Sequence, residues 1–216
     1  MTYTVLAIDP RSQLIGAATA SYSLAVGNAV IAVAPDVGAV ASQAYTNRRL
    51  RARCIDGLRN GMSPQHLTDT IPAWDPGHTH RQVAVIDRNG RTSAVTGSAC
   101  SAWAGEVEEP GMVTIGNLLA GPEVLTVMRT VFKESADAGT FDDPAGRFAS
   151  RLLDTMSAGE RAGGDARGRQ SAAVQVAHMS STRDWPPALA VDLRADNSRD
   201  PLADLGEALQ LQFGPH

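Results

Sequence analysis

Four short apolar runs fill the first 44 residues of the chain, before any stretch with helical periodicity. The runs are TYTVLAID, LIGAATASYS, AVIAVA and VGAVASQA. The first two are separated by DPRSQ and the last two by Pro35-Asp36, and proline and aspartate initiate turns because they fix φ and offer local hydrogen bonds. Short apolar runs between turn residues are typical of strands, so the chain is predicted to open with four strands.

Two helices are predicted next. The first covers residues 47–60, where Leu50, Cys54 and Leu58 recur every four residues along one face. The second begins at Ser63, an N-cap followed by proline at the first helical position, where the missing N–H costs no hydrogen bond. It is expected to end near Ile71-Pro72.

The remaining chain returns to strands and then to further helices. Residues 81–97 predict a hairpin, with Asn89-Gly90 in a type I′ turn that needs positive φ at both positions. Residues 111–117 predict a strand, helices follow Gly121-Pro122 and end at Gly159, and the last elements are strands at 171–178 and 187–195 and a helix at 200–213. Grouped strands and paired helices predict an α+β protein with antiparallel sheets and helices layered outside them.

Length and charge set limits on the function. The 216 residues predict a single domain, 1–216, in which 195–216 form a C-terminal tail or helix. A net charge of −4 gives no reason to expect nucleic-acid binding. Because no 18-residue apolar run or signal sequence is evident, we expect a cytoplasmic protein without membrane contact. Cys54 and Cys100 suggest buried thiols and not a disulfide framework.

Six segments together carry a resemblance to a known family. TYTVLAIDP, IGAATAS, VGAVASQAYTN, HRQVAVID, GNLLAGPEV and GGDARGRQSAA occur in the order and spacing of domain of unknown function family 1028 (DUF1028). The resemblance covers residues 2 to about 195. It implies an N-terminal-nucleophile (Ntn) hydrolase-like fold, which is a four-layer αββα sandwich of two antiparallel sheets.

In an Ntn enzyme, a Ser, Thr or Cys at the start of the first strand attacks an amide, and its own α-amino group acts as the general base. The resemblance therefore makes Thr2 and Thr4 the candidate nucleophiles. Removal of Met1 would expose Thr2, whereas Thr4, which matches the family's Ser/Thr position, would require cleavage after Tyr3. Strand alternation places both side chains on one face. The alternative is that both are ordinary strand threonines.

The single lysine argues against a proteasome-like site. Proteasome-like Ntn enzymes place a lysine on the third strand, but residues 28–40 contain none and Lys133 falls on a predicted outer helix. An arginine would have to supply the positive field, and it cannot act as a base because its pKa exceeds about 12.

Several polar residues are candidates for substrate binding. The junction Ser42–Asn47 matches the position that supplies the oxyanion N–H groups in the Ntn fold, although Asn47 also fits a helix cap. Ser21 ends the second strand, and an arginine at the start of the first helix could bind a carboxylate. The full set of candidates is Ser21, Gln43, Asn47, Arg48, His80, Gln82, Asn117 and Arg167.

The stretch AGGDARGRQSAAVQV, residues 162–176, lies between a predicted helix and a predicted strand. Ntn enzymes have an Asp-containing, Gly-rich turn at this point, beside the nucleophile. The resemblance thus makes Asp165 and Ser171 catalytic candidates that orient the nucleophile's amine and hydroxyl. The alternative is a structural turn in which Asp165 pairs with Arg167.

The leading hypothesis is an amidohydrolase that cleaves a small amide, cyclic or carboxylate-bearing, without cofactor or metal. The first rival is a non-catalytic Ntn-fold binding or assembly protein. The second is a metal-dependent hydrolase using Asp75, His78 and His80, because imidazoles two residues apart on a strand face the same way. An exposed sandwich edge leads us to expect a homodimer or a larger homo-oligomer.

Overall fold

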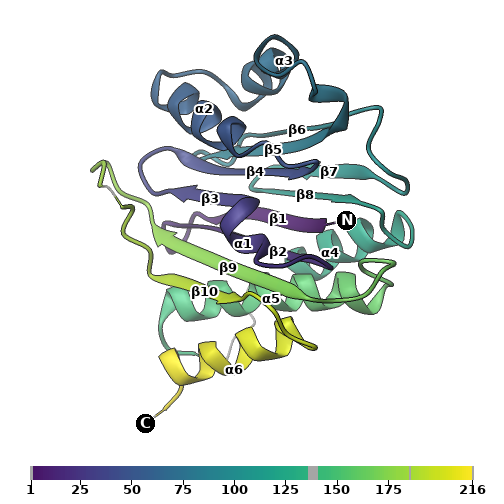
Figure 1. Cartoon of the computed structure of the whole chain (residues 1–216). Helices are drawn as coiled ribbons and strands as arrows, with labels where there is room; N and C mark the ends of the chain where they lie inside the picture. The colour runs from purple at the N-terminus through teal and green to yellow at the C-terminus, as the bar shows by residue number, and fades with distance from the viewer. Residues whose placement is uncertain (1, 136–140, 185, 216) are drawn as a thin grey trace.

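The computed structural model describes residues 2–135, 141–184 and 186–215. The described strands form two antiparallel sheets (Figure 1), as predicted for this α+β protein. The larger sheet has the order β10-β9-β2-β1-β8-β7 and consists of β1 (Thr2–Asp9), β2 (Leu14–Ser21), β7 (Gly105–Glu109), β8 (Met112–Asn117), β9 (Ser171–His178) and β10 (Val191–Ala195). The smaller sheet has the order β3-β4-β5-β6 and consists of β3 (Ile31–Ala34), β4 (Gly38–Ala44), β5 (Arg81–Asp87) and β6 (Thr92–Thr96).

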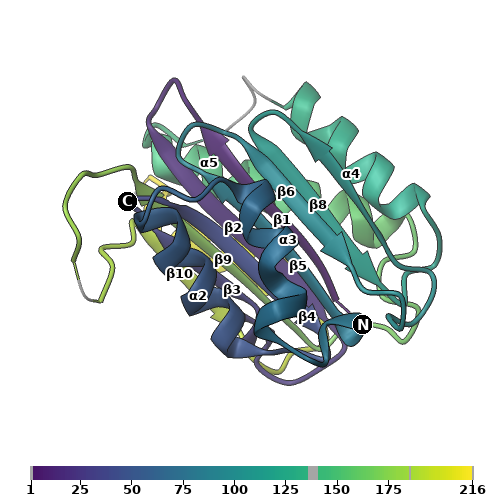
Figure 2. The same ribbon diagram turned by 90° about the horizontal axis from the view of Figure 1, so that it is seen from above.

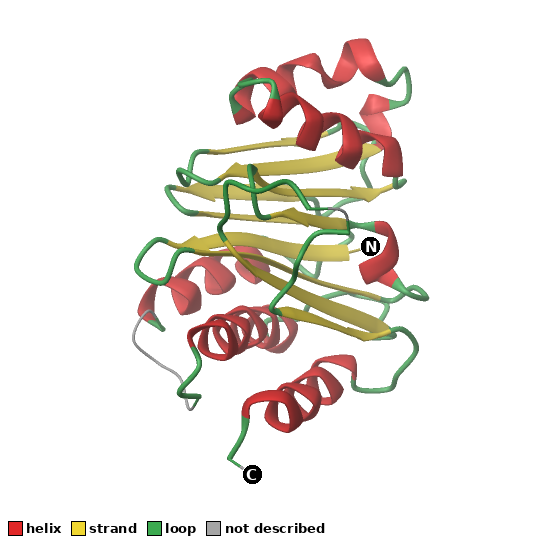
Figure 3. Ribbon diagram, turned by 90° about the vertical axis from the view of Figure 1, so that its left-hand side faces the viewer, coloured by secondary structure: helices red, strands yellow, loops and turns green. Residues whose placement is uncertain are grey.

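Helices cover the outer face of each sheet, as Figures 1 and 3 show. The smaller sheet is covered by α2 (Arg48–Arg59) and α3 (Pro64–Trp74), which lie over its strands in Figure 2. The larger sheet is covered by α4 (Glu123–Glu134), α5 (Pro144–Arg161) and α6 (Pro201–Phe213). The short α1 (Val26–Ala29) lies beside β9, and a 3-10 turn spans His78–His80.

Apolar side chains fill the three spaces between these elements. Leu6, Ile15 and Ile86 belong to the cluster between the two sheets. Leu50 and Leu67 belong to the cluster beneath α2 and α3, and a third cluster lies between the larger sheet and α4, α5 and α6. Both faces of each sheet are therefore buried, which explains why the central strands read as almost continuous apolar runs.

The predicted helix starts are confirmed. The Asn47 side chain accepts a hydrogen bond from the backbone N–H of Arg49, and the Ser63 side chain caps α3 in the same way through His66. α3 was expected to end near Pro72 but continues to Trp74. The N–H of Asp75 bonds to the carbonyl of Ile71 at 2.9 Å and closes its last turn.

Three features of the strands differ from prediction. β7 was not expected, because three of the five residues in its sequence GEVEE are glutamates, and it pairs at the sheet edge, where alternate side chains meet solvent. The last strand begins at Val191 and not at residue 187. The turn between β5 and β6 is not type I′, since Gly90 has positive φ but Asn89 does not; the Asp87 carboxylate instead accepts from the N–H groups of Asn89 and Arg91.

The two cysteines differ in how deeply they are buried. Cys54 is buried as expected, whereas Cys100 is only half-buried, because it lies in the loop between β6 and β7. Within the described ranges, no helix is both long and apolar enough to cross a bilayer.

Candidate functional site

Strand register brings polar residues from distant parts of the chain to one end of the larger sheet. Thr2 at the start of β1 pairs with Asn117 at the end of β8, and Ser21 at the end of β2 pairs with Ser171 at the start of β9. The neighbouring end of the smaller sheet contributes Gln43 of β4, which pairs with Gln82 of β5.

Thr2 and Thr4 both point from β1 toward the smaller sheet, as the alternation predicts, but their hydroxyls are bound differently. The Thr2 hydroxyl donates to the Ser21 hydroxyl at 3.2 Å. The Thr4 hydroxyl donates to Gln43 Oε1 at 2.6 Å and lies 2.8 Å from the hydroxyl of Thr19, in a position without solvent exposure. Thr2 therefore lies at the edge of this polar cluster and Thr4 lies in its interior.

A network of buried amides connects the two sheets behind Thr2. Gln43 Nε2 donates to the Thr2 carbonyl at 3.0 Å and to Gln82 Oε1 at 2.7 Å. Asn117 Nδ2 donates to the same Gln82 oxygen at 3.1 Å. Gln82 Nε2 in turn reaches the carbonyls of Gly116 and Gly105 and the hydroxyl of Thr96. Because buried polar groups cost free energy unless they are paired, this network fixes the start of β1 in one position.

Sequence reasoning missed three members of this network, namely Thr19, Thr96 and Glu106. Thr96 donates to the Glu106 carboxylate as well as accepting from Gln82. Thr19 was predictable in principle, since it lies two residues before Ser21 and alternation places both on the face that meets β1's threonines. Thr96 was predictable too, since it lies opposite Gln82 in the predicted hairpin, whereas Glu106 was not, because β7 itself was not expected.

Two residues beside the network have left-handed backbone conformations. Ala44, directly after Gln43, has a φ of 64°, and Leu118, directly after Asn117, has a φ of 54°. This region is unfavourable for residues with a Cβ atom and persists where the surroundings enforce it, often next to functional groups. Both bends occur where a strand turns away from the end that holds Thr2.

The Gly-rich stretch 162–170 crosses this end of the larger sheet. Asp165 forms an isolated bridge with Leu119, which follows β8, and its carboxylate accepts from the N–H of Tyr22, which follows β2, at 2.7 Å. Since β1 lies between β2 and β8, the turn passes the start of β1. Asp165 also pairs with Arg167 at 3.1 Å, so the turn is salt-bridged as well as hydrogen-bonded to the residue after β2.

Ser171 contacts the loop after β2. Its hydroxyl donates to the carbonyl of Ser23 at 2.5 Å and accepts from the N–H of Val26 at 3.0 Å. Ser23 in turn donates to the Ser21 hydroxyl at 2.9 Å. Ser171 and Ser21 are therefore both hydrogen-bonded to Ser23 of this loop.

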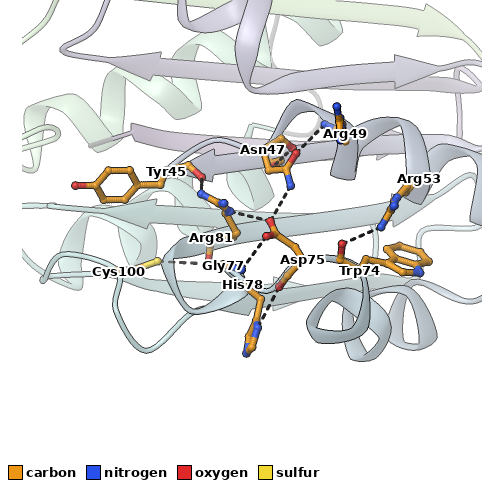
Figure 4. A network of polar contacts seen from close by, with 11 residues as sticks. Tyr45, Asn47, Arg49, Arg53, Trp74, Asp75, Gly77, His78, Arg81 and Cys100 are labelled. Carbon is orange, nitrogen blue, oxygen red and sulfur yellow. Dashed lines mark hydrogen bonds and ion pairs between the residues drawn. The ribbon is translucent and has the colours of Figure 1, made fainter.

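A second polar cluster surrounds Asp75 on the side of α2, as Figure 4 shows. The Asp75 carboxylate accepts from Arg81 Nε at 2.8 Å, from Asn47 Nδ2 at 2.7 Å and from the N–H of Gly77 at 2.9 Å. The hydrogen bond from Arg81, with those from Asn47 and Gly77, lowers the pKa of Asp75 to about 2. Asn47 is thus both the N-cap of α2 and a partner of Asp75, which ties α2 to the start of β5.

The remaining candidates lie around these two clusters. Arg48 is exposed at the start of α2, and the exposed His80 ring meets the Tyr45 ring edge-on at 5.6 Å between centroids. The Arg167 guanidinium lies 5.6 Å from the centroid of Tyr22. Lys133 is on α4 and pairs with Glu109, so the lysine of a proteasome-like site has no counterpart on β3.

The described residues contain no group of three or more His, Cys, Asp or Glu side chains that could hold a metal ion. Asp75 binds Arg81, and His78 contacts the Asp75 carbonyl, not its carboxylate, through Nδ1. The donor set proposed for a metal-dependent hydrolase is therefore occupied by protein contacts.

The two helix-covered antiparallel sheets and the polar cluster at one end define an α+β protein with a buried amide and hydroxyl site between its sheets. The sequence model of a family of unknown function (DUF1028) matches residues 2–205, and the chain belongs to this family. A crystal structure of a DUF1028 protein from Silicibacter pomeroyi is similar, with a TM-score of 0.83 and 31% identity over 97% of this chain and 85% of that chain. A comparison with curated proteins found no match.

Proposed function

We propose that the protein is an Ntn-type amidohydrolase that cleaves a small amide, with Thr2 as its nucleophile. The observation that carries the proposal is the position of Thr2. It begins β1 at the polar end of the two sheets, its hydroxyl contacts Ser21, and its carbonyl is held by Gln43. The helix-covered sheet pair is compatible with the four-layer sandwich that the family resemblance implies.

Thr2 is a better nucleophile candidate than Thr4 on geometric grounds. Thr2 is 6% exposed and is the first described residue of β1, so removal of Met1 alone would give it a free α-amino group. Thr4 is fully buried, its hydroxyl has two side-chain partners, and β1 is paired on both sides of it.

The proposed reaction has two steps. The Thr2 oxygen attacks the amide carbon, the α-amino group takes the hydroxyl proton and passes it to the departing nitrogen, and an ester on Thr2 remains. Water then attacks the ester and releases the carboxylic acid, and the proton returns to the Thr2 oxygen. We assign oxyanion binding to the β4–α2 junction, because the N-terminus of α2 favours negative charge.

Asp165 and Ser171 have positioning roles in this proposal. Asp165 holds Tyr22, and Ser171 holds Ser23 and Val26, so together they fix the loop after Ser21. Ser21 accepts the Thr2 hydroxyl, and this contact orients the nucleophile.

The test is amine release from a panel of small linear and cyclic amides, with and without a carboxylate. Thr2→Ala is expected to reduce kcat/KM by at least about a thousandfold for any amide that the protein cleaves, whereas Thr2→Ser retains a hydroxyl and a measurable rate. Thr126→Ala, an exposed threonine on α4, is the matched control and leaves the rate unchanged.

Hydrolysis that survives Thr2→Ala would exclude Thr2 as the nucleophile. If no amide in the panel is cleaved and Thr2→Ala still supports the protein's cellular role, the non-catalytic binding protein is the better conclusion.

A further inference from the structure

A cavity of about 190 Å³ lies on the helix-facing side of the larger sheet. Tyr3 lines it from β1, and alternation directs this side chain away from the face that carries Thr2 and Thr4. The cavity therefore lies on the opposite face of β1 from the Thr2 side chain, although it shares Ser21, Asp165 and Ser171 with the surroundings of Thr2. Its wall also includes Glu160 at the end of α5, Asp165 and Arg169 of the Gly-rich stretch, Ser21 at the end of β2 and Ser171 at the start of β9.

The Tyr3 hydroxyl is the first sign that a ligand belongs here. Tyr3 is only 2% exposed and lines the cavity, so its phenol O–H is a hydrogen-bond donor at the cavity wall. Native structures rarely leave a buried hydroxyl without a partner, because the lost hydrogen bond to water costs free energy. The cavity beside it offers the space in which a ligand atom could accept the phenol proton.

The charges around the cavity are incompletely balanced. Arg169 lies 2.9 Å from the Asp200 carboxylate and 3.4 Å from that of Glu160, so one guanidinium forms ion pairs with two carboxylates. Asp165 has its own partner in Arg167. Glu160 is therefore the carboxylate with the weakest neutralisation, and burial raises its pKa.

The phenol remains a neutral donor beside these groups. Burial and the neighbouring carboxylates of Glu160 and Asp165 raise the pKa of Tyr3 far above its ordinary value, and Arg169 offsets this only in part. At neutral pH the cavity thus presents an O–H donor, a guanidinium and a partly neutralised carboxylate. A ligand that satisfies all three must carry both an anionic acceptor and a cationic donor.

We propose that this cavity binds a small amino acid zwitterion, with its carboxylate on the Tyr3 hydroxyl and Arg169 and its ammonium on Glu160. A volume of about 190 Å³ corresponds to roughly six water molecules, which is ample space for a small amino acid such as alanine.

The test is calorimetric or NMR titration of the purified protein with L-alanine. N-acetyl-L-alanine lacks the ammonium and L-alaninamide lacks the carboxylate, and each is expected to bind at least about tenfold more weakly than L-alanine. Tyr3→Phe keeps the buried ring and removes only the hydroxyl, so it is expected to weaken L-alanine binding by about five- to tenfold. Tyr45→Phe, at a tyrosine that is 70% exposed and outside the cavity, is the matched control and leaves affinity unchanged.

Thermal unfolding of Tyr3→Phe shows whether the variant is folded, and Glu160→Gln, at a side chain that is 22% exposed, provides a second variant with the same expected loss. Absence of L-alanine binding at millimolar concentration would overturn the proposal. Equal binding of all three probes, or unchanged affinity in both variants, would also overturn it. None of these measurements depends on Thr2 or on amide hydrolysis.

Discussion

Gln82 joins more polar groups of the site than any neighbouring side chain. Its oxygen accepts from Gln43 and Asn117, and its nitrogen reaches the Gly116 carbonyl. A single substitution at this position would leave several buried groups without partners at once. The amide chemistry of this position is therefore needed for stability as well as for the position of Thr2.

Gln82→Leu is expected to lower the free energy of unfolding by about 2–4 kcal/mol, because several buried donors and acceptors lose their partners. Urea unfolding measures the change. Gln65→Leu, on the exposed face of α3, is the control and should shift stability by no more than about 0.5 kcal/mol. Similar losses in the two variants would show that the buried network contributes little.

Asp75 makes stability depend on pH. Its pKa in the folded protein is about 2, below the ordinary value of 3.8. The folded state therefore binds the Asp75 proton less tightly than the unfolded state, and the stabilisation is present above about pH 4 and is lost as the pH falls toward 2. Asp75→Asn should lower Tm at pH 7, and the difference from the parent protein should narrow between pH 4 and 2.

The control for Asp75 is Asp56→Asn, at an exposed carboxylate that pairs with Arg59 on α2. This variant should follow the Tm profile of the parent protein across the same pH range. A difference between Asp75→Asn and the parent that stays constant from pH 7 to pH 2 would contradict the assignment.

At the scale of elements, close approach between strands limits substitution. A Cβ atom at Gly38 would lie 2.3 Å from the Ile86 carbonyl oxygen, a backbone atom of the neighbouring strand that cannot move aside alone. Gly206, within α6, has no atom within 4 Å of its Cβ position. The same change at these two glycines therefore has opposite expected effects.

Gly38→Ala is expected to destabilise the protein by about 1–3 kcal/mol through overpacking. Gly206→Ala is expected to stabilise it by about 0.5–1 kcal/mol, because alanine loses less backbone entropy in a helix. Chemical denaturation of both variants measures the difference. A stabilising Gly38→Ala would show that β4 and β5 are not as close as described.

Elements with a strong local signal were predictable from the sequence. Asn47 and Ser63 mark helix starts because their side chains cap the first turn, a contact that depends only on neighbouring residues. β7 lacked such a signal, since its charged residues are compatible with a strand only at a sheet edge. The Asn89-Gly90 turn was misjudged because the Asp87 carboxylate supplies hydrogen bonds that favour another turn.

At the scale of the whole molecule, the site depends on the order in which strands pair. Thr2, Ser21, Gln43, Gln82 and Asn117 were candidates from the sequence, and the structure brings them together at one end of the sheets. Their residue types and strand ends were predictable. The placement of β1 between β2 and β8 was not, because it follows from packing between segments more than a hundred residues apart.

The same pairing order explains why other candidates fall elsewhere. Arg48 and His80 are on the α2 side of the smaller sheet, near the Asp75 cluster, and not in the amide network. The Gly-rich turn, by contrast, reaches the start of β1 because Asp165 contacts residues after β2 and after β8.

The central claim is that Thr2 acts as an N-terminal nucleophile, and intact-protein mass spectrometry tests it most directly. The natively purified, active protein is measured before and after reaction with a β-lactone electrophile. We predict a mass that lacks the initiator methionine and, after reaction, a single adduct that maps to the peptide beginning with Thr2. A fully active protein that retains Met1 would contradict the claim.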